Sequence, residues 1–381
     1  MGILTRTIAN NLGENPNPGI NYRNFLINGS MVFFRRGQSF SPASGQGYTA
    51  DRWMMDESTD GAVTVSQTSD VPAGIGIKNA LKIVVNTADT SIAANQYCGL
   101  TQFIEGQNMI TNNYGTANAE NMMLSFWVKS NKTGIYCVRF VKEAGDGTRY
   151  ETPIEYTINV ANTWEKKNIS LSPTAGSTAL ITASAGAIKQ NANAGFRIQF
   201  THAVGTDFQA TNNTWVAGSD KMGTTNSVNL LDSTSNEWLL TGVQLEVGTS
   251  TTSFEHLPED VELLRCQRYY YEIYSSRIYS GVFDMAVGTN YDAGQLFCMK
   301  DLPTTMRAPP SIVQTTGTDY LTSLRNGVQD GFDGFNGVGA PGYTNIAIFT
   351  SGAENQSGVA GSAVRIRVNN TAYILAANAE L

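Results

Sequence analysis

Histidine, cysteine and charged residues are scarce in this chain of 381 residues. Histidine, the side chain most often used as a general acid or base at neutral pH, occurs only as His202 and His256. The sequence motifs of zinc proteases, serine hydrolases, P-loop enzymes and dinucleotide-binding enzymes are missing. We therefore expect no catalytic residue and no enzymatic activity.

Carboxylates are the remaining candidate catalytic groups, because glycoside hydrolysis needs two of them about 5 to 10 Å apart. The acidic residues that such a mechanism could use are scattered along the chain: Asp51, Glu105, Glu246 and Glu255. Nothing in their spacing brings any two together. A polysaccharide-degrading enzyme is therefore an alternative that the sequence does little to support.

Metal ligands are also sparse. Asp330, Asp333 and Asn336 alternate with glycines as calcium ligands can, but the closing Glu of an EF-hand loop is missing. The four cysteines form no CxxC pair and lie at Cys98, Cys137, Cys266 and Cys298. Isolated thiols of this kind are typical of a protein made in a reducing cytosol. We expect no metal and no cofactor.

Two further absences concern partners. The chain has 25 Lys and Arg against 32 Asp and Glu, and this net charge of -7 argues against nucleic acid, because phosphate contacts need clustered positive charge. No segment approaches the ~20 consecutive apolar residues of a membrane-spanning helix, and the N-terminal segment lacks the apolar core of a secretory signal peptide. We expect neither nucleic acid nor a membrane as a partner.

Glycine and short apolar runs are abundant instead. The 37 glycines and 41% apolar residues favour short strands and turns over long helices. Alternating apolar residues between turn residues predict strands at 62–67, 80–85, 99–104, 122–129, 134–141, 156–160, 164–171, 195–202 and 238–247. Because no helix-like pattern separates these strands, they predict an all-β sandwich of two sheets.

The N-terminal region has two parts. Residues 1–23 are polar and contain the turn cluster NPNPG, so they form either an arm that docks elsewhere or a frayed terminus. From Asn24 onward the run NFLINGSMVFFRRGQSF predicts strand, turn and strand around Asn28-Gly29. The following YTADRW supplies an aromatic anchor.

Two long polar segments interrupt the strands, at 172–194 and 203–229. Loops of this length on a sandwich are commonly functional. The second loop holds Trp215 and Phe208, whose flat rings could stack on a sugar beside the polar side chains of Asn212, Asn213 and Asp220. The alternative role for Trp215 is that of a buried anchor. The other four tryptophans, at positions 53, 127, 164 and 238, lie on or beside predicted strands and are expected in the core.

One helix is well specified, at 257–272. Pro258 suits the first helical turn, and acidic residues precede Arg265 and Arg268, as the helix dipole favours. Apolar side chains fall on opposite sides of this helix, so we expect it to connect two modules. The residues expected to pack between the modules are Val261, Leu264, Tyr270 and Tyr271.

Residues 273–381 predict a second, smaller β-rich module. Its strand-like runs lie at 278–287, 294–300, 311–315, 344–350, 363–369 and 372–377. The Gly-rich segment 331–342 contains Phe332 and Phe335, and we expect it to form an exposed tip or a subunit contact.

Several sequence fragments in combination resemble one family. They are NFLINGSMVFFRRGQSF, YTADRW, LTQFIEG, LSFWVKS, TWEKKNISL, FRIQF and GVQLEVGTSTTSFEHLPEDVELLRCQRYYY, within residues 24–271. The chain resembles the carbohydrate-binding-module-like jelly roll of bacteriophage tail-fibre and other virion structural proteins. The resemblance implies a jelly-roll β-sandwich at 24–256, closed by the connecting helix at 257–272 and followed by the module at 273–381. The two long loops depart from the family pattern.

The resemblance also implies a function. A virion fibre protein attaches to host-surface polysaccharide, assembles as a homo-oligomer that is commonly a trimer, and docks on other virion proteins, here through the arm at 1–23. Such a protein is assembled in the host cytoplasm and resides in the virion. The alternative that the sequence leaves open is a capsid decoration or head-fibre protein without a receptor role.

Overall fold

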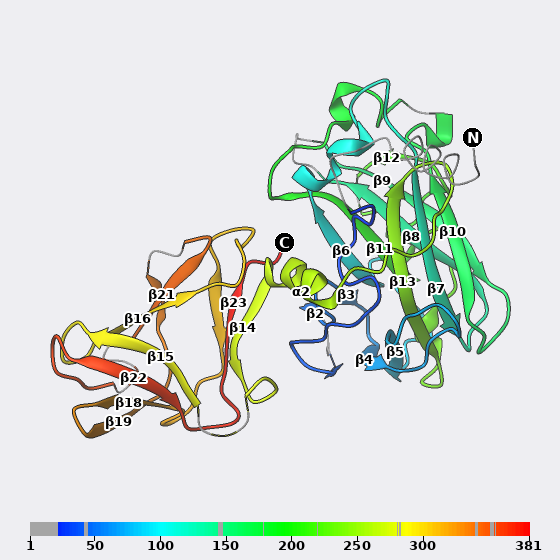
Figure 1. Cartoon of the computed structure of the whole chain (residues 1–381). Coiled ribbons are helices and arrows are strands. Elements are labelled where there is room, and N and C mark those ends of the chain that lie inside the picture. Colours follow the sequence, from blue (N-terminus) through cyan, green and yellow to red (C-terminus); the bar gives the residue numbers. More distant parts are fainter. Residues whose placement is uncertain are drawn as a thin grey trace, which may run out of the picture. The chain divides into compact units, whose positions relative to one another are not determined.

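The computed structural model describes residues 22–41, 45–143, 148–177, 179–218, 220–279, 281, 283–339, 342–350, 354 and 356–381. The chain divides into two compact units, Met1–Leu257 (unit 1) and Pro258–Leu381 (unit 2) (Figure 1). Each unit has a hydrophobic core of its own. Apart from Tyr22 and Arg23, the predicted N-terminal arm lies outside the described residues.

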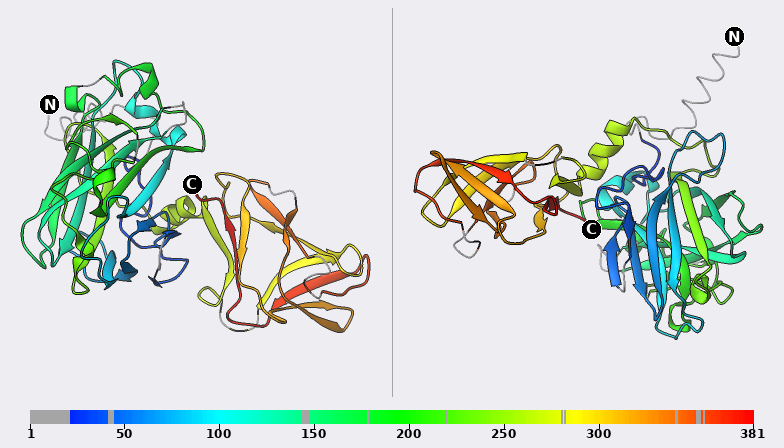
Figure 2. Two further views of the ribbon diagram at one scale, coloured as in Figure 1. Left: turned by 180° about the vertical axis from the view of Figure 1, so that it is seen from behind. Right: turned by 90° about the horizontal axis from the view of Figure 1, so that it is seen from below.

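Unit 1 is a sandwich of two antiparallel sheets, as the strand pattern predicts, and it is a jelly roll, as the resemblance implies (Figure 2). The six-stranded sheet has the order β1-β4-β5-β13-β7-β10, and the seven-stranded sheet has the order β12-β9-β8-β11-β6-β3-β2. The strands of the six-stranded sheet are β1 (Ser39–Phe40), β4 (Ala62–Thr68), β5 (Ala80–Thr87), β7 (Met122–Ser130), β10 (Glu165–Leu171) and β13 (Glu237–Val247). Those of the seven-stranded sheet are β2 (Gly45–Tyr48), β3 (Met54–Ser58), β6 (Tyr97–Glu105), β8 (Gly134–Lys142), β9 (Tyr150–Ile158), β11 (Ala194–Val204) and β12 (Val216–Ala217).

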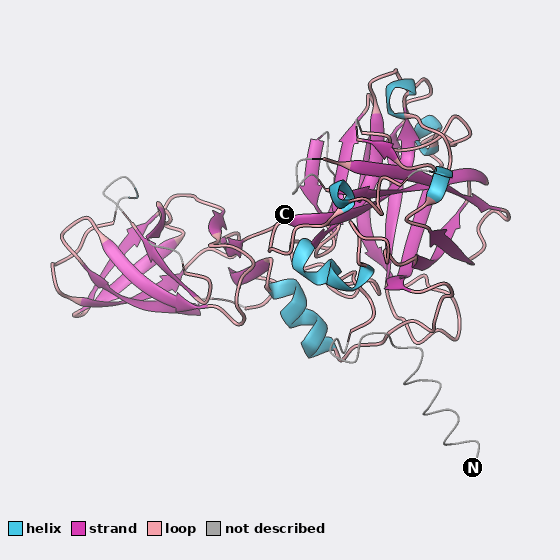
Figure 3. Ribbon diagram, turned by 90° about the horizontal axis from the view of Figure 1, so that it is seen from above, coloured by secondary structure: helices cyan, strands magenta, loops and turns pink. Residues whose placement is uncertain are grey.

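In the described part of unit 1, helical structure is confined to short 3-10 turns in the connections between strands (Figure 3). These turns are η1 (Gly106–Asn112), η3 (Ala175–Ser177), η4 (Ser184–Gly186), η5 (Thr206–Phe208) and η6 (Leu230–Asp232). The first long loop predicted from the sequence contains η3 and η4, and the second contains η5 and the short strand β12.

The core of unit 1 follows from the two-residue period of its strands. In β8, Tyr136 and Phe140 belong to the core between the sheets, whereas Cys137 and Arg139 alternate with them and point to the opposite face. Phe140 is fully buried, and full burial of a side chain of this kind stabilises the fold by about 1.5 to 3 kcal/mol. The same alternation therefore builds the core and sets which side chains line the outer face.

The predicted hairpin around Asn28-Gly29 is wrong. Residues 24–37 form turns and bends, and Asn28 and Met31 both adopt a left-handed backbone conformation with φ of 57°. The Asn28 side chain donates to Phe33 O at 2.8 Å and accepts from Phe33 N at 3.0 Å. These bonds close a local turn in place of a strand ladder. Leu26 and Met31 are fully buried, so the apolar residues of the segment fill the core of the sandwich.

Unit 2 is a β-rich module, as predicted, and begins with α2 (Glu259–Gln267), the only α-helix in the described part of the chain. A three-stranded sheet has the order β14-β23-β17, and a seven-stranded sheet has the order β19-β18-β22-β15-β16-β21-β20. The strands are β14 (Tyr270–Ser275), β15 (Phe283–Asn290), β16 (Leu296–Asp301), β17 (Ser311–Gln314), β18 (Leu321–Arg325), β19 (Val328–Phe332), β20 (Gly337–Gly339), β21 (Asn345–Phe349), β22 (Ala363–Val368) and β23 (Ile374–Asn378). Within the described residues, no helix is both long and apolar enough to span a membrane.

The connecting helix is shorter than the predicted 257–272. It ends at Gln267, and Tyr270 and Tyr271 belong to β14, which pairs with β23. Tyrosine favours strands, and pairing with β23 supplies the backbone hydrogen bonds that a continued helix would otherwise make. Val261 and Leu264 do lie on α2. Packing of these four residues between the two modules stays a prediction.

The Gly-rich segment 331–342 is not an exposed tip over its described part. Phe332 and Phe335 are 0% and 2% exposed and belong to the core of unit 2. Their rings meet edge to face with centroids 5.8 Å apart, a favourable geometry for two aromatic rings. The two phenylalanine rings of this segment are therefore buried anchors of unit 2.

Candidate functional site

The seven-stranded sheet of unit 1 carries polar side chains on the face that points away from the core. We call this surface the polar face and define it by Asp56, Tyr97, Thr101, Cys137, Arg139, Glu151, Glu155, Arg197, Gln199 and Thr201. The strand register places Arg139 of β8 beside Gln199 of β11, and Gln199 beside Thr101 of β6. Three neighbouring strands therefore present hydrogen-bonding groups side by side.

An ion-pair network occupies the middle of the polar face. Arg139 and Glu151 are both fully buried, and Arg139 Nε lies 2.8 Å from Glu151 Oε2. Arg139 Nη2 also contacts this carboxylate and lies 2.9 Å from Asp220 Oδ1, while Arg149 Nη1 lies 3.0 Å from the same Asp220 oxygen. Partial burial raises the pKa of Asp220, but hydrogen bonds from the two arginines and their charges lower it below its ordinary value. Asp220 is therefore ionised at neutral pH.

A segment of the second long loop lies across this network. We call residues 220–228 the strap. Lys221 N donates to Glu151 Oε1 at 2.9 Å, and Thr201 Oγ1 donates to Met222 O at 2.6 Å. These bonds fasten the strap to β9 and β11, which is why Arg139 and its neighbours are buried although they point away from the core.

Beside the strap the polar face has a more accessible edge, formed by the rim cluster of Gln46, Asp56, Tyr97 and Phe208. Gln46 is exposed, and Tyr97 and Phe208 are half-buried. Gln46 Nε2 and the Tyr97 hydroxyl each donate to Asp56 Oδ1 at 3.2 Å. The rings of Tyr97 and Phe208 meet edge to face, with centroids 5.2 Å apart. Two aromatic rings thus adjoin a hydrogen-bonded carboxyl group and an exposed amide.

The protonation of the rim cluster follows from its burial. Burial raises the pKa of Asp56 above its ordinary value, although hydrogen bonds from Gln46 and Tyr97 lower it in part. Burial, followed by the charge of Asp56, raises the pKa of Tyr97 to about 12. Tyr97 therefore stays protonated at neutral pH, and its hydroxyl donates a hydrogen bond to Asp56. Such fixed donors and acceptors suit the binding of hydroxyl groups.

Two buried polar atoms of the polar face, Thr101 Oγ1 and Gln199 Nε2, have no hydrogen-bond partner among the described residues. Gln199 Oε1 does accept from Arg139 Nη1 at 3.1 Å, so the side chain is oriented by the ion-pair network. Leaving a buried polar group without a partner costs about 1 to 3 kcal/mol. A ligand hydroxyl that reached these two atoms would therefore be stabilised.

The structure disperses the residues that the sequence predicts for sugar binding. Trp215 is only 1% exposed, and its Nε1 donates to Ser172 O at 2.8 Å, so its ring is a buried anchor and the predicted stacking role is wrong. Asn212 and Asn213 are exposed but lie beside β9, where Asn212 Oδ1 accepts from Glu155 N at 3.0 Å. Phe208 and Asp220 do reach the polar face, in the rim cluster and the strap respectively.

Sequence reasoning misses Arg139, Glu151, Tyr97 and Asp56. One signal was present: Arg139 interrupts the apolar residues of a predicted strand at 134–141, which indicates a charged group on one face. Nothing local indicates that Glu151 and Asp220 contact Arg139. In the sequence, Glu151 lies 12 positions from Arg139 and Asp220 lies 81 positions from it.

The other tryptophans fall into two groups. Trp53 and Trp238 are fully buried in the core of unit 1, which confirms their prediction. Trp127 and Trp164 are half-buried and lie outside that core, so the prediction for them is wrong. Trp127 pairs with Lys166 across β7 and β10, on the outer face of the six-stranded sheet. A second, smaller aromatic surface therefore lies on the opposite side of unit 1 from the polar face.

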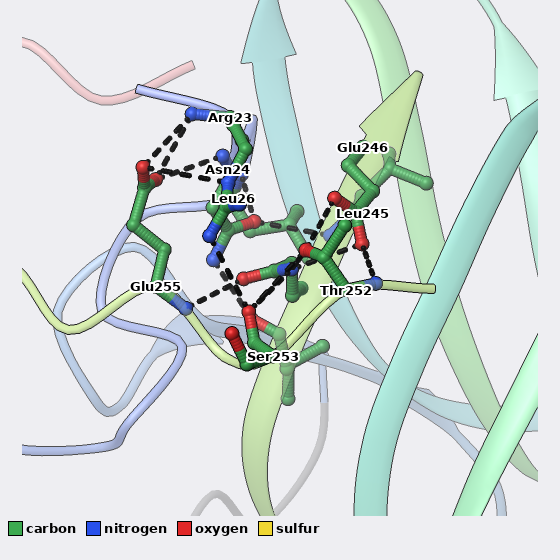
Figure 4. Close-up of polar contacts among 10 residues, drawn as sticks. Arg23, Asn24, Leu26, Leu245, Glu246, Thr252, Ser253 and Glu255 are labelled. Carbon is green, nitrogen blue, oxygen red and sulfur yellow. Dashed lines mark hydrogen bonds and ion pairs between the residues drawn. The ribbon is translucent and has the colours of Figure 1, made fainter. Parts of the chain in front are cut away.

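A further polar cluster holds the first described residues against the end of unit 1 (Figure 4). The Glu255 carboxylate accepts from the backbone N–H groups of Arg23 and Asn24, both at 3.0 Å. Glu246 accepts from Thr252 N at 2.9 Å, within the same network. The structure thus brings two of the scattered carboxylates, Glu246 and Glu255, into one network. Both accept hydrogen bonds from backbone N–H groups and so hold the backbone in place. This cluster fixes where the predicted arm meets the sandwich.

Among the described residues, no group of three or more His, Cys, Asp or Glu side chains is placed to hold a metal ion. The carboxylates with calcium-like spacing bind protein groups: Asp330 accepts from Ser357 N at 2.7 Å, and Asp333 accepts from Asp319 N at 3.0 Å. These contacts give both side chains a structural role in unit 2.

No family model matches the chain, and no curated protein matches it. Among solved structures, it is similar to the enzymatically active domain of tailspike protein 4 of bacteriophage CBA120, with 17% identity and a TM-score of 0.31, over 60% of this chain and 22% of that chain. It is similar to the carbohydrate-binding module TmCBM61 in complex with β-1,4-galactotriose, with 13% identity and a TM-score of 0.28, over 60% of this chain and 100% of that chain. It is also similar to the family 11 carbohydrate-binding module of a cellulosomal cellulase of Clostridium thermocellum, with 12% identity and a TM-score of 0.27, over 55% of this chain and 98% of that chain.

Proposed function

We propose that this protein is a non-enzymatic structural component of a virion, a tail fibre or receptor-binding protein that attaches to host-surface glycans through the polar face. The rim cluster is the observation that carries this proposal. Sugars are recognised by aromatic rings that meet their C–H faces and by fixed polar groups that meet their hydroxyls. Tyr97 and Phe208 supply the rings, and Gln46 and Asp56 supply the fixed polar groups.

The polar groups of the site favour binding over catalysis. Asp56 is occupied by hydrogen bonds from Gln46 and Tyr97, and Glu151 by those from Arg139. A glycosidase needs one carboxyl group free to protonate the leaving oxygen and another free to act as nucleophile or base. The proposed role is therefore attachment without cleavage. Several copies in one particle would strengthen weak single contacts through avidity.

A glycan array and a host-cell adsorption assay test this proposal. Wild-type protein is expected to bind a restricted set of glycans, and Phe208→Ala and Gln46→Ala are expected to weaken that binding about tenfold or more, since each removes one element of the rim cluster. Tyr343→Ala is the control, because Tyr343 is an exposed aromatic residue of unit 2, at 52%. Its binding should match wild type.

Capsid decoration is the competing function. A decoration protein without a receptor role would bind neither glycans nor host cells, with or without these substitutions. That result would contradict the proposed attachment function. Release of reducing sugar ends from a bound polysaccharide would contradict the non-enzymatic part of the proposal.

A further inference from the structure

We infer that the polar face takes an acidic saccharide, whose carboxylate replaces that of Asp220 on Arg139 and Arg149. This inference rests on the proposed glycan-binding function and names the chemical class of its ligand. The strap would then act as an internal competitor, since it places its own carboxylate where the ligand's carboxylate binds.

The geometry of Asp220 is that of a bound carboxylate ligand. One oxygen, Oδ1, accepts from Arg139 Nη2 at 2.9 Å and from Arg149 Nη1 at 3.0 Å. Guanidinium groups are the preferred protein partners of carboxylates because their N–H groups lie in a planar fork. The Asp220 side chain is 44% exposed, whereas that of Arg139 is 0% exposed. Arg139 is therefore held inside the fold, Arg149 is 26% exposed, and the carboxylate that they share comes from the solvent side.

The charges of the network demand an anion at this position. Arg139, Arg149 and Arg197 form ion pairs with Glu143, Glu151 and Asp220, which makes three positive charges against three negative ones. Without the Asp220 carboxylate, three positive charges would face two negative ones. Arg139 would keep Glu151 and Arg149 would keep Glu143, but the network would carry a surplus positive charge next to the buried Arg139, which is unfavourable. A ligand that displaces Asp220 must therefore bring a negative charge of its own.

Asp220 and Glu151 differ in how firmly the fold holds them. Glu151 lies inside β9, where pairing with β8 fixes its position. Asp220 begins the strap, and its φ of 60° is a left-handed conformation, which Asp adopts more readily than most residues and glycine adopts without steric cost. Of the two carboxylates that contact Arg139, Asp220 is thus the one that can leave without breaking a strand.

The surroundings of the arginines suit the rest of a sugar ring. Gln199 Nε2 and Thr101 Oγ1 are buried without a partner among the described residues, and Gln199 also contacts Arg139. A saccharide carboxylate on the two arginines would bring its hydroxyl groups toward these atoms. Charge and hydrogen bonding therefore point to the same ligand class, an acidic sugar.

Equilibrium binding of two matched oligosaccharides to the full chain tests the inference. The probes are an oligomer of galacturonic acid and a neutral oligomer of galactose of equal length. Asp220→Gly removes the competing carboxylate and suits the left-handed backbone. We expect this variant to bind the acidic oligomer at least about tenfold more tightly than wild type does, with no gain for the neutral oligomer, because only the acidic oligomer competes with the Asp220 carboxylate for the two arginines.

Two further variants complete the design. Arg149→Met in the Asp220→Gly background should abolish the gain, while Asp301→Asn, at an exposed position of unit 2, should behave as wild type. Tryptophan fluorescence verifies folding, since all five tryptophans lie in unit 1. If Asp220→Gly gains nothing for the acidic oligomer while wild type binds the neutral one, the inference is wrong and the proposed function stands. If neither protein binds either oligomer or any glycan of the array, both fail.

Discussion

His202 is a titratable residue with no access to solvent. Its ring is fully buried in unit 1 and meets the ring of Trp238 edge to face, with centroids 4.6 Å apart. Neither ring nitrogen has a hydrogen-bond partner among the described residues. Burial disfavours the charged imidazolium and lowers the pKa of His202 to about 3. The residue is therefore neutral in the folded protein at any ordinary pH.

This burial predicts acid sensitivity of unit 1. An unfolded histidine takes up its proton near pH 6.5, whereas folded His202 does so near pH 3, so the unfolded state binds more protons between these values. The contribution to stability is fully present above about pH 6.5 and is lost as the pH falls toward 3. Between pH 7 and pH 5 we expect His202 to lower the free energy of unfolding by about 2 kcal/mol.

Urea unfolding at pH 7 and pH 5, followed by tryptophan fluorescence, measures this effect. His202→Phe keeps a ring in contact with Trp238 and should lose about 2 kcal/mol less than wild type over the same interval. His256→Phe serves as the control, because His256 is exposed. An equal loss in His202→Phe and wild type would show that His202 does not contribute to the acid sensitivity.

At the scale of elements, the segment 24–37 shows how tertiary packing replaces a predicted hairpin. Gly29 lies directly against β13: Val243 N donates to Gly29 O at 2.9 Å, and a Cβ atom on Gly29 would lie 2.2 Å from Val243 O. No side chain fits this distance. The residue that reads as a hairpin turn is thus required for a close approach between two segments distant in the sequence.

Substitution of this glycine is expected to destabilise unit 1. Gly29→Ala forces the segment away from Val243, and overpacking of this kind typically costs about 1 to 3 kcal/mol. Gly47→Ala is the matched control, since a Cβ atom there meets nothing within 4 Å. Thermal unfolding followed by tryptophan fluorescence should show a lower Tm for Gly29→Ala alone. Equal Tm values for both variants would contradict the close contact.

Elements with strong alternation could be predicted from the sequence, and contacts between distant elements could not. The strand β8 is evident because Tyr136 and Phe140 alternate with residues of the other face, and the predicted run 134–141 matches it closely. The first three residues of β14 fall inside the predicted helix 257–272, because the tyrosines after Gln267 have no alternating polar partners and only pairing with β23 makes them a strand. The candidate site was missed for the same reason, since Arg139 and Asp220 meet only after the strap folds back.

At the scale of the whole molecule, the chain has two separate hydrophobic cores, one in each unit. All groups of the polar face belong to unit 1, which folds around its own core, so the proposed glycan contacts need no residue from unit 2. Unit 2 has its own core and sheets and contributes no residue to the polar face. Attachment through unit 1 leaves unit 2 and the arm for assembly into a particle, as the proposed virion role requires.

A crystal structure of the full chain with a glycan selected by the array would show directly which surface binds the sugar. We predict sugar density on the polar face, in contact with Tyr97 and Phe208. Density on the other aromatic surface, beside Trp127 and Trp164, or on unit 2, with the polar face unchanged from its glycan-free form, would contradict the claim.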